Sequence, residues 1–210
     1  MTQIEKDFLL LKFKGSGGLS FIDVGANKGD YSKFLLENFK CVNGYMFEPI
    51  ESCYNYLINN FKEPFLSINN ISIGSYKGVI EFNEAVNKET HSSIVNRPIF
   101  KGYNISKRLI NIDKLDNIID TKIDLLKIDT EGYEFEVIKG CEQLLNDRMI
   151  KYIQFEYGGT YLDNGIKLND VITFLKSLGY KTYNFHDGKF NILENYKDDY
   201  RYNNFYAFFE

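Results

Sequence analysis

Short apolar runs alternate along this chain with longer stretches in which apolar residues recur at helical spacing. The apolar runs predict strands at 21–24, 43–47, 65–73, 123–129 and 152–157. The periodic stretches predict helices at 30–38, 50–61, 134–146 and 168–178. This alternation favours a mainly parallel sheet that is covered by helices. No helical pattern separates two further strands, at 180–185 and 204–209, so we expect them to pair antiparallel at the sheet's edge.

Two segments stand outside this alternation. Residues 1–14 place charges around a short apolar run, which predicts an amphipathic helix within 1–18 and neither a membrane span nor a signal peptide. Residues 79–83 predict a β-hairpin arm, and the polar, irregular stretch 84–110 is expected to be a mobile substrate loop. Since no repeat or low-complexity linker interrupts the sequence, we expect residues 1–210 to form a single domain.

Composition narrows the class of protein. Hydrophobic residues make up 44% of the 210 positions and aromatic residues 16%, which is enough for one domain with a substantial core. The net charge of −4 argues against nucleic-acid binding, which usually requires a basic surface. The three cysteines, Cys41, Cys53 and Cys141, have neither zinc-ligand spacing nor a disulfide framework, so we expect a reducing, cytoplasmic location.

The segment FIDVGANKGD (21–30) carries the most information about function. A strand ends at Asp23, the residues from Gly25 through Ala26 and Asn27 to Gly29 form a tight turn, and a helix follows. Glycine permits a sharp turn and a close ligand, and the N-terminus of the helix presents free N–H groups and a positive dipole. This arrangement predicts a site for a nucleotide-like or sulfonium cofactor.

The spacing of the glycines distinguishes between cofactors. The turn reads Gly25-x-x-x-Gly29 and lacks the middle glycine that admits a pyrophosphate in NAD-binding domains. S-adenosylmethionine has no pyrophosphate, and Asp23 and Asn27 could hold its methionine part. The spacing therefore favours S-adenosylmethionine over NAD.

Polar residues also follow the other strands, at the edge of the sheet where cofactors bind in open α/β folds. They are Asp23, Glu48, Asn70, Asp129 and Glu156. Glu48 lies 19 residues after Gly29 and is expected to accept hydrogen bonds from the ribose hydroxyls. A solvated turn before Pro49 is the alternative for Glu48.

The segment KIDTEGYE (127–134) holds a second group of carboxylates. Asp129 ends a buried strand and Glu131 follows it in the turn, where the two charges could raise one pKa and create a base. Asp129, together with Glu156, is also a possible ligand of Mg²⁺ or Mn²⁺. We assign Glu134 the simpler role of capping the next helix.

Two further residue patterns are less specific. His91, in HSSI, could take a proton from a hydroxyl or could be a surface loop residue. Tyr103 and Lys107 match the Tyr-x-x-x-Lys pair of short-chain dehydrogenases, but the glycine fingerprint of those enzymes is missing. We interpret that match as chance.

Taken in order, FIDVGANKGDYS, MFEP, INNISIGSYKGVIEF, HSSI, LDNIID, IDLLKIDTEGYEFEVIKG and IQFEY resemble the FkbM family of S-adenosylmethionine-dependent methyltransferases over residues 19–185. The resemblance implies a class I methyltransferase, Rossmann-like α/β three-layer sandwich, with seven strands and an antiparallel last strand. It places Asp23, Gly25, Asn27 and Gly29 at the methionine part and Glu48 at the ribose. Asp129, Glu131 and Gly132 are placed near the transferred methyl.

We therefore expect an O-methyltransferase that acts on a hydroxyl of a small molecule or glycan, most often a sugar. The candidate catalytic residues are Asp129, Glu131, Glu156 and His91. Two alternatives stay open: an NAD-linked sugar oxidoreductase or epimerase, and a cofactor-binding module without catalysis. The acceptor and the oligomeric state are not determined by the sequence.

Overall fold

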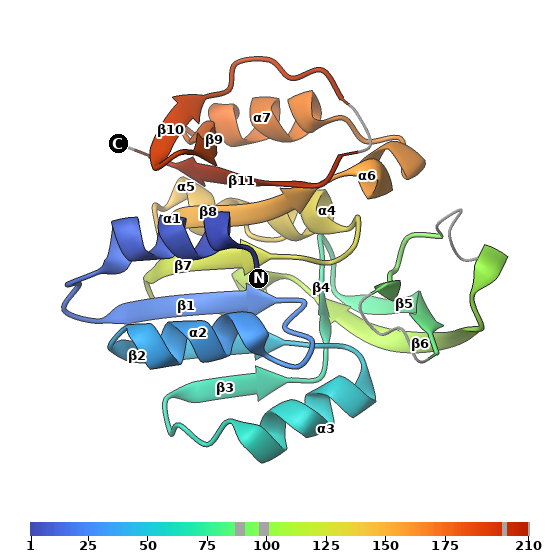
Figure 1. Cartoon of the computed structure of the whole chain (residues 1–210). Coiled ribbons are helices and arrows are strands. Elements are labelled where there is room, and N and C mark those ends of the chain that lie inside the picture. Colours follow the sequence, from blue (N-terminus) through green and yellow to red (C-terminus); the bar gives the residue numbers. More distant parts are fainter. Residues whose placement is uncertain (87–90, 97–100, 199–200, 210) are drawn as a thin grey trace.

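The computed structural model describes residues 1–86, 91–96, 101–198 and 201–209 (Figure 1). The helices are α1 (Gln3–Phe13), α2 (Asp30–Asn38), α3 (Glu51–Asn60), η3 (Leu115–Asn117), α4 (Glu134–Lys139), α5 (Glu142–Asn146), α6 (Gly159–Asp163) and α7 (Leu168–Ser177). The strands are β1 (Leu19–Val24), β2 (Cys41–Phe47), β3 (Leu66–Asn69), β4 (Ser72–Ile73), β5 (Gly78–Ala85), β6 (Ile105–Asp113), β7 (Ile123–Ile128), β8 (Ile150–Tyr157), β9 (Lys181–His186), β10 (Lys189–Ile192) and β11 (Asn203–Phe208).

The main sheet has eight strands in the order β10-β9-β11-β8-β7-β1-β2-β3. The neighbours from β3 to β8 are all parallel, so their five carboxyl ends meet at one edge of the sheet. The last strand, β11, is antiparallel to both β8 and β9. The predicted α/β fold, a mainly parallel sheet with an antiparallel last strand, is confirmed.

The main sheet differs from the prediction in its number of strands, which is eight instead of seven. The additional strand, β10, pairs antiparallel with β9 and forms the edge of the sheet, while β11 lies inside it. A turn at Asp187 and Gly188 joins β9 to β10, and both residues have positive φ, 51° and 72°. Asp-Gly is a common hairpin turn, so the sequence held a signal for this strand.

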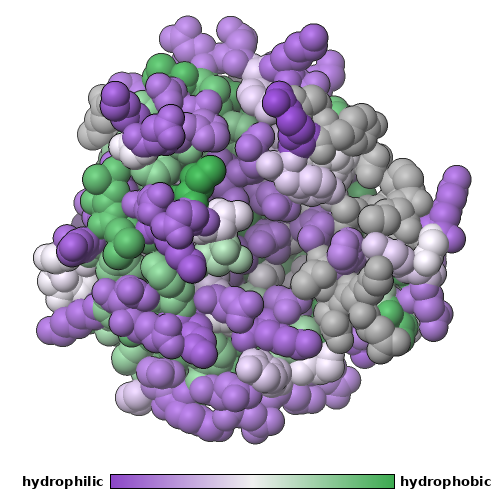
Figure 2. Space-filling view, in the orientation of Figure 1, coloured by the Kyte–Doolittle hydropathy of each residue, from purple (hydrophilic) through white to green (hydrophobic). Residues whose placement is uncertain are grey.

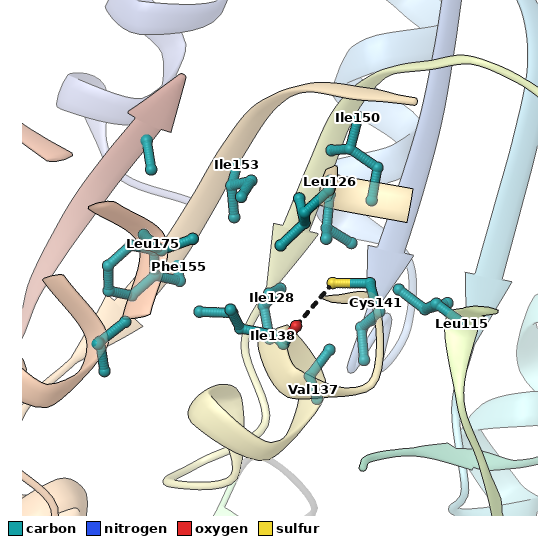
Figure 3. Packing of buried hydrophobic residues seen from close by; sticks show 14 of the residues in the cluster. Leu115, Leu126, Ile128, Val137, Ile138, Cys141, Ile150, Ile153, Phe155 and Leu175 are labelled. Atoms are coloured by element: carbon teal, nitrogen blue, oxygen red, sulfur yellow. Dashed lines mark hydrogen bonds between the residues drawn. The ribbon is translucent and has the colours of Figure 1, made fainter. Parts of the chain in front are cut away.

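Apolar residues on the two faces of the sheet form two separate cores. Phe21 and Leu125 face a core with α1, α2 and α3, whereas their neighbours Ile22 and Leu126 face a core with α4, α5 and α7. Figure 3 shows part of the second core, where the Cys141 thiol donates a hydrogen bond to the Ile138 carbonyl at 3.1 Å. The result is a three-layer sandwich in which both faces of the sheet are buried.

Helix α1 covers part of the first core (Figure 1). Its start is fixed by a capping box between Thr2 and Glu5, and it buries Phe8, Leu9 and Phe13. Within the described ranges, no helix is long and apolar enough to cross a bilayer. Hydrophilic residues dominate the face of the molecule in Figure 2, and the hydrophobic residues on that face gather in small patches.

A second sheet, in the order β4-β6-β5, projects from the main sheet as an arm (Figure 1). The expected loop 84–110 is wrong in part, because Ile105 to Ile110 belong to β6 and pair along β5. This strand was not predicted because one of its faces is exposed to solvent and carries Lys107 and Asn111. Residues 87–90 and 97–100 of the expected loop lie outside the described residues.

The predicted helix over 134–146 is divided into α4 and α5 at Gly140. A Cβ atom at Gly140 would lie 1.9 Å from the carbonyl oxygen of Gly74, at the base of the arm. The backbone therefore approaches the arm too closely for any other residue type, and the helix is interrupted there.

Candidate active site

The turn after β1 packs directly against the end of β7. Gly25 has a φ of 76°, and a Cβ atom there would lie 1.9 Å from the carbonyl oxygen of Asp129. The N–H groups of Gly25 and Ala26 both donate to the carbonyl oxygen of Phe47, at 3.0 and 3.1 Å. The turn is thus fixed between the carboxyl ends of β2 and β7, and only glycine fits at Gly25.

The same turn leads into α2. Asn27 has a φ of 48°, and Gly29 is the N-cap of α2 with a φ of 83°. A Cβ atom at Gly29 would lie 2.5 Å from the ring of Phe61. Both glycines are needed for the shape of the turn, in which the N–H groups of residues 25–29 all donate within the protein.

A cavity lies at this edge of the sheet, between the turn and the arm. Its apolar wall is formed by Phe47, Ile50, Ile71, Ile73, Phe82 and Ile94. Its polar lining includes Gly25, Asn27 and Glu48, which we call the cofactor end, and Asp129, Thr130 and Glu131. Of the predicted cofactor residues, Gly25, Asn27, Glu48 and Asp129 line the cavity, whereas Asp23, Ala26, Gly29 and Asn70 do not.

Asp23 lies below the turn, away from the cavity lining. Its side chain is fully buried, and Oδ2 accepts a hydrogen bond from Ser32 Oγ at 2.8 Å. The ammonium of Lys127 lies 3.0 Å from Oδ1. The structure therefore engages this carboxylate with Ser32 and Lys127.

Glu48 holds the backbone of the cofactor end in place through two hydrogen bonds. Its side chain is buried, Oε2 accepts the Asn27 N–H at 2.7 Å and Oε1 accepts the Ile50 N–H at 2.8 Å. Burial raises the pKa of Glu48 to about 7, although these two backbone donors act in the opposite direction. Each carboxylate oxygen keeps a second lone pair that can accept a ligand hydroxyl.

Asn70 supports the loop after β2. Its amide nitrogen donates to the carbonyl oxygens of Glu48 and Pro49, at 2.9 and 3.2 Å. Because Asn70 is exposed and lies outside the cavity lining, the structure places it behind Glu48.

Three carboxylates come together beyond the cofactor end. One oxygen each of Asp129, Glu131 and Glu156 lies within 4.8 Å of the others, and we call this group the acidic cluster. Burial, followed by the charges of Asp129 and Glu131, raises the pKa of Glu156 to about 9. Like charges held this close favour a bound proton or cation, so the cluster can accept a proton from a nearby hydroxyl.

Glu134 has a structural role, but it braces the turn before α4 instead of capping that helix as the sequence predicts. Its fully buried carboxylate accepts the N–H groups of Thr130, at 2.8 Å, and of Gly132, at 3.0 and 3.1 Å. It thereby fixes the turn that carries Asp129 and Glu131. Burial raises the pKa of Glu134 to about 6.

The arm contributes Ser93, which the sequence analysis did not single out within HSSI. Its buried hydroxyl donates to the carbonyl oxygen of Glu131 at 2.8 Å and accepts the Val95 N–H at 3.0 Å. Glu131 has a φ of 57°, a conformation that non-glycine residues seldom adopt. The arm thus helps to hold Glu131 in this conformation.

His91 is not among the residues that line the cavity. Its ring packs edge-on against the ring of Tyr103 within the arm, with 5.5 Å between centroids. The structure therefore brings Asp129, Glu131 and Glu156 together, and it places His91 in the arm, outside the cavity lining.

The sequence analysis also missed Lys127. Its ammonium is buried and lies 3.5 Å from Asp129 Oδ2 as well as 3.0 Å from Asp23 Oδ1. The available signal was a single charged residue inside the apolar strand IDLLKID, since lysine is seldom buried without a partner.

Comparisons with known proteins agree with this architecture. A structure of the methyltransferase FkbM from Methylobacillus flagellatus KT is similar over 96% of this chain, with a TM-score of 0.62 and 16% identity. This chain spans about half of that protein, 48% of its length. None of the curated proteins compared with the chain matches it.

Two other solved structures share the fold at low identity. The precorrin-6y C5,15-methyltransferase from Geobacter metallireducens GS-15 is 14% identical, with a TM-score of 0.52 over 100% of this chain and 90% of its own. A TehB-like SAM-dependent methyltransferase from Corynebacterium glutamicum is 12% identical, with a TM-score of 0.52 over 97% of this chain and 86% of its own.

The family is shown by the sequence itself. The model of the methyltransferase FkbM domain matches residues 23–182, which include the glycine turn, Glu48 and the acidic cluster. Because this match covers most of the chain, the protein belongs to the FkbM methyltransferase family.

Proposed function

We propose that this protein is an S-adenosylmethionine-dependent O-methyltransferase that acts on a hydroxyl of a small molecule or glycan, with a sugar as the acceptor class that the family resemblance implies. The observation that carries the proposal is one cavity with two unlike ends: a glycine turn beside buried Glu48, and the two members of the acidic cluster that line the cavity, Asp129 and Glu131. The first end suits a cofactor, and the second suits removal of a proton.

The residues of the cofactor end fit S-adenosylmethionine. Glu48 offers free lone pairs to the ribose hydroxyls, and the apolar wall, with Phe47, Ile50 and Phe82, offers a surface for the adenine. The tight turn at Gly25 leaves room for the methionine part without the space that a pyrophosphate requires.

The acidic cluster supplies the chemistry of the chain itself. Bound S-adenosylmethionine supplies a methyl group that is already activated on a sulfonium. The protein therefore has to align the acceptor oxygen and remove its proton. Asp129 or Glu131 accepts that proton from the hydroxyl, while Glu156, whose raised pKa favours its protonated form, adds no further charge to the cluster. With the cofactor bound, this transfer would exchange its C–S bond for a C–O bond on the acceptor and leave S-adenosylhomocysteine.

The proposal also covers the location of the protein, its class of acceptor and its domain organisation. The three cysteines, Cys41, Cys53 and Cys141, are not joined in disulfides, which supports a cytoplasmic location, and the net charge of −4 supports an acceptor other than a nucleic acid. We also propose that residues 1–210 act as one catalytic domain. Asp129 and Glu156 are the residues to test for Mg²⁺ or Mn²⁺ dependence, because hard oxygen ligands suit these ions.

The cofactor is tested by calorimetric titration with S-adenosylmethionine and, separately, with NAD. We expect saturable binding of S-adenosylmethionine alone. Binding of NAD alone would overturn the proposal in favour of an oxidoreductase or epimerase. Tight binding of S-adenosylmethionine without turnover on any sugar acceptor, with and without Mg²⁺ or Mn²⁺, would indicate a module without catalysis.

The role of Asp129 is tested by Asp129→Ala. Because this change removes a carboxylate at the junction of the two ends, we expect methyl transfer to fall by at least about 100-fold. The measurement is S-adenosylhomocysteine formation at saturating cofactor. Asp120→Ala, at an exposed position before β7, is the matched control and should keep normal turnover. Near-normal turnover of Asp129→Ala would exclude the assigned role.

A further inference from the structure

Lys127 occupies the junction of three elements that meet below the cavity. Its ammonium lies 3.0 Å from Asp23 Oδ1 at the end of β1, and 3.5 Å from Asp129 Oδ2 after β7. It also donates a hydrogen bond of 3.3 Å to the carbonyl oxygen of Gly25 in the turn. One side chain therefore contacts the glycine turn and a carboxylate of the acidic cluster.

The environment of Lys127 keeps its ammonium charged. Burial by itself would lower the pKa of Lys127, but the nearby carboxylates of Asp23 and Asp129 outweigh burial and raise it. The fully buried Asp23 has a second partner in Ser32, whereas Asp129 is partly exposed at the cavity. The ammonium is thus a permanent charge between a structural carboxylate and a carboxylate of the site.

The remaining side of the ammonium faces an aromatic ring with a fixed position. The ring centroid of Tyr31, in the first turn of α2, is 5.5 Å from Lys127 Nζ. The Tyr31 hydroxyl donates to Gln154 Oε1 at 2.7 Å, and Gln154 Nε2 donates to Glu5 Oε1 of α1 at 2.9 Å. These buried bonds leave the ammonium little freedom to move away from Gly25 and Asp129.

From this geometry we infer that Lys127 is a positioning residue for the cofactor: its ammonium holds the Gly25 carbonyl and the Asp129 carboxylate in the arrangement that binds S-adenosylmethionine. The inference rests on the proposed function, because it names a residue that the cofactor site needs without placing it in contact with the cofactor. A purely structural lysine would stabilise the fold and leave the affinity of a folded protein unchanged.

The test separates folding from cofactor binding. Lys127→Met removes the charge but leaves Asp23 buried and without its cation, so this variant can fail to fold. The double variant Asp23→Asn with Lys127→Met removes both charges and keeps similar volumes. Asp23→Asn alone retains the ammonium, and Lys107→Met, which breaks an exposed ion pair with Glu81, is the matched control.

Thermal denaturation identifies the folded variants, and calorimetry gives their dissociation constants for S-adenosylmethionine and S-adenosylhomocysteine. We expect the folded double variant to bind both ligands about tenfold more weakly than the wild type. Asp23→Asn should lose less affinity, and Lys107→Met should bind both ligands normally. An equal loss of affinity for the two ligands supports positioning, because S-adenosylhomocysteine lacks the sulfonium charge.

Three results would overturn the inference. Wild-type affinities in the folded double variant would leave Lys127 a structural role only. A change for S-adenosylmethionine without one for S-adenosylhomocysteine would indicate a charge effect on the sulfonium instead of positioning. A wild-type protein that binds neither ligand would overturn the proposed function and this inference with it, whereas the first two results leave the proposed function intact.

Discussion

Glu48 and Glu156 both carry a carboxylate at the carboxyl end of a parallel strand, but their surroundings differ. Glu48, at the cofactor end, is 3% exposed and accepts two backbone N–H groups. Glu156 faces the carboxylates of Asp129 and Glu131 within 4.8 Å. Backbone donors thus satisfy the carboxylate of Glu48, whereas the carboxyl group of Glu156 lies next to groups of like charge. The comparison teaches that Glu48 maintains the shape of the cofactor end, whereas Glu156 belongs to a cluster that we propose for proton transfer.

Gly25→Ala is expected to have the largest effect on the cofactor end. The new Cβ would lie 1.9 Å from the Asp129 carbonyl oxygen, in a left-handed conformation with a φ of 76°. We expect a loss of about 3 kcal/mol in the free energy of unfolding, measured by denaturant titration, and loss of S-adenosylmethionine binding.

Gly15→Ala is the control for this change. Gly15 has a similar φ of 84°, but no atom of the described residues lies within 4 Å of the position of its Cβ. We expect it to lose about 1 kcal/mol, from backbone strain alone. Equal losses in the two variants would contradict the view that contact with Asp129 determines the shape of the cofactor end.

Glu48→Gln is expected to have a smaller effect, on affinity. The ionised carboxylate accepts the ribose hydroxyls, so wild-type binding of S-adenosylmethionine should weaken as the pH falls from 8 to 6, through the pKa of about 7. The variant should bind about tenfold more weakly at pH 8 and lose this pH dependence. Calorimetry at several pH values measures both effects, with exposed Glu51→Gln as the control. A wild-type affinity that rises on acidification would contradict the assignment.

Glu156→Gln should have the smallest effect and the opposite sign, because it relieves the repulsion in the acidic cluster. The folded protein holds a proton on Glu156 up to about pH 9, whereas the unfolded chain releases it near pH 4.3, as a free Glu does. The protonated Glu156 therefore contributes fully to the stability of the wild type below about pH 4.3. This contribution is lost as the pH rises from there to about 9.

At pH 8 we expect Glu156→Gln to be about 1 kcal/mol more stable than the wild type and to unfold at a higher temperature. At pH 4 we expect this difference to disappear. Thermal melts in a chelator measure the difference, and exposed Glu142→Gln is the control. Destabilisation at pH 8 would show that the carboxylate makes a favourable interaction that the variant removes.

Much of this fold could be predicted because its signals are local. The run FIDV, the turn from Gly25 to Gly29 and the polar helix after it lie within twenty residues, and the structure places β1, the turn and α2 there. The carboxyl ends of the strands were also predictable, since parallel neighbours bring Glu48, Asp129 and Glu156 to one edge.

The direction in which each side chain points was not predictable. Asp23 lies directly opposite Lys127 in the pairing of β1 with β7, although 104 residues separate them in the sequence. Register between distant strands is set by packing, so the sequence alone does not show that Asp23 faces a buried ammonium and not the cavity. The same holds for Ser93, whose contact with Glu131 depends on how the arm folds back.

The position of β11 has a consequence for how the chain is made. This strand is synthesised after β9 and β10 but inserts between β8 and β9. While the ribosome is still adding residues 203–208, β8 and β9 each have an unpaired edge, and such edges invite pairing with other chains. Closure of this sheet therefore waits for residues 203–208, and the nascent chain is most vulnerable to aggregation through β8 and β9 immediately before β11 emerges.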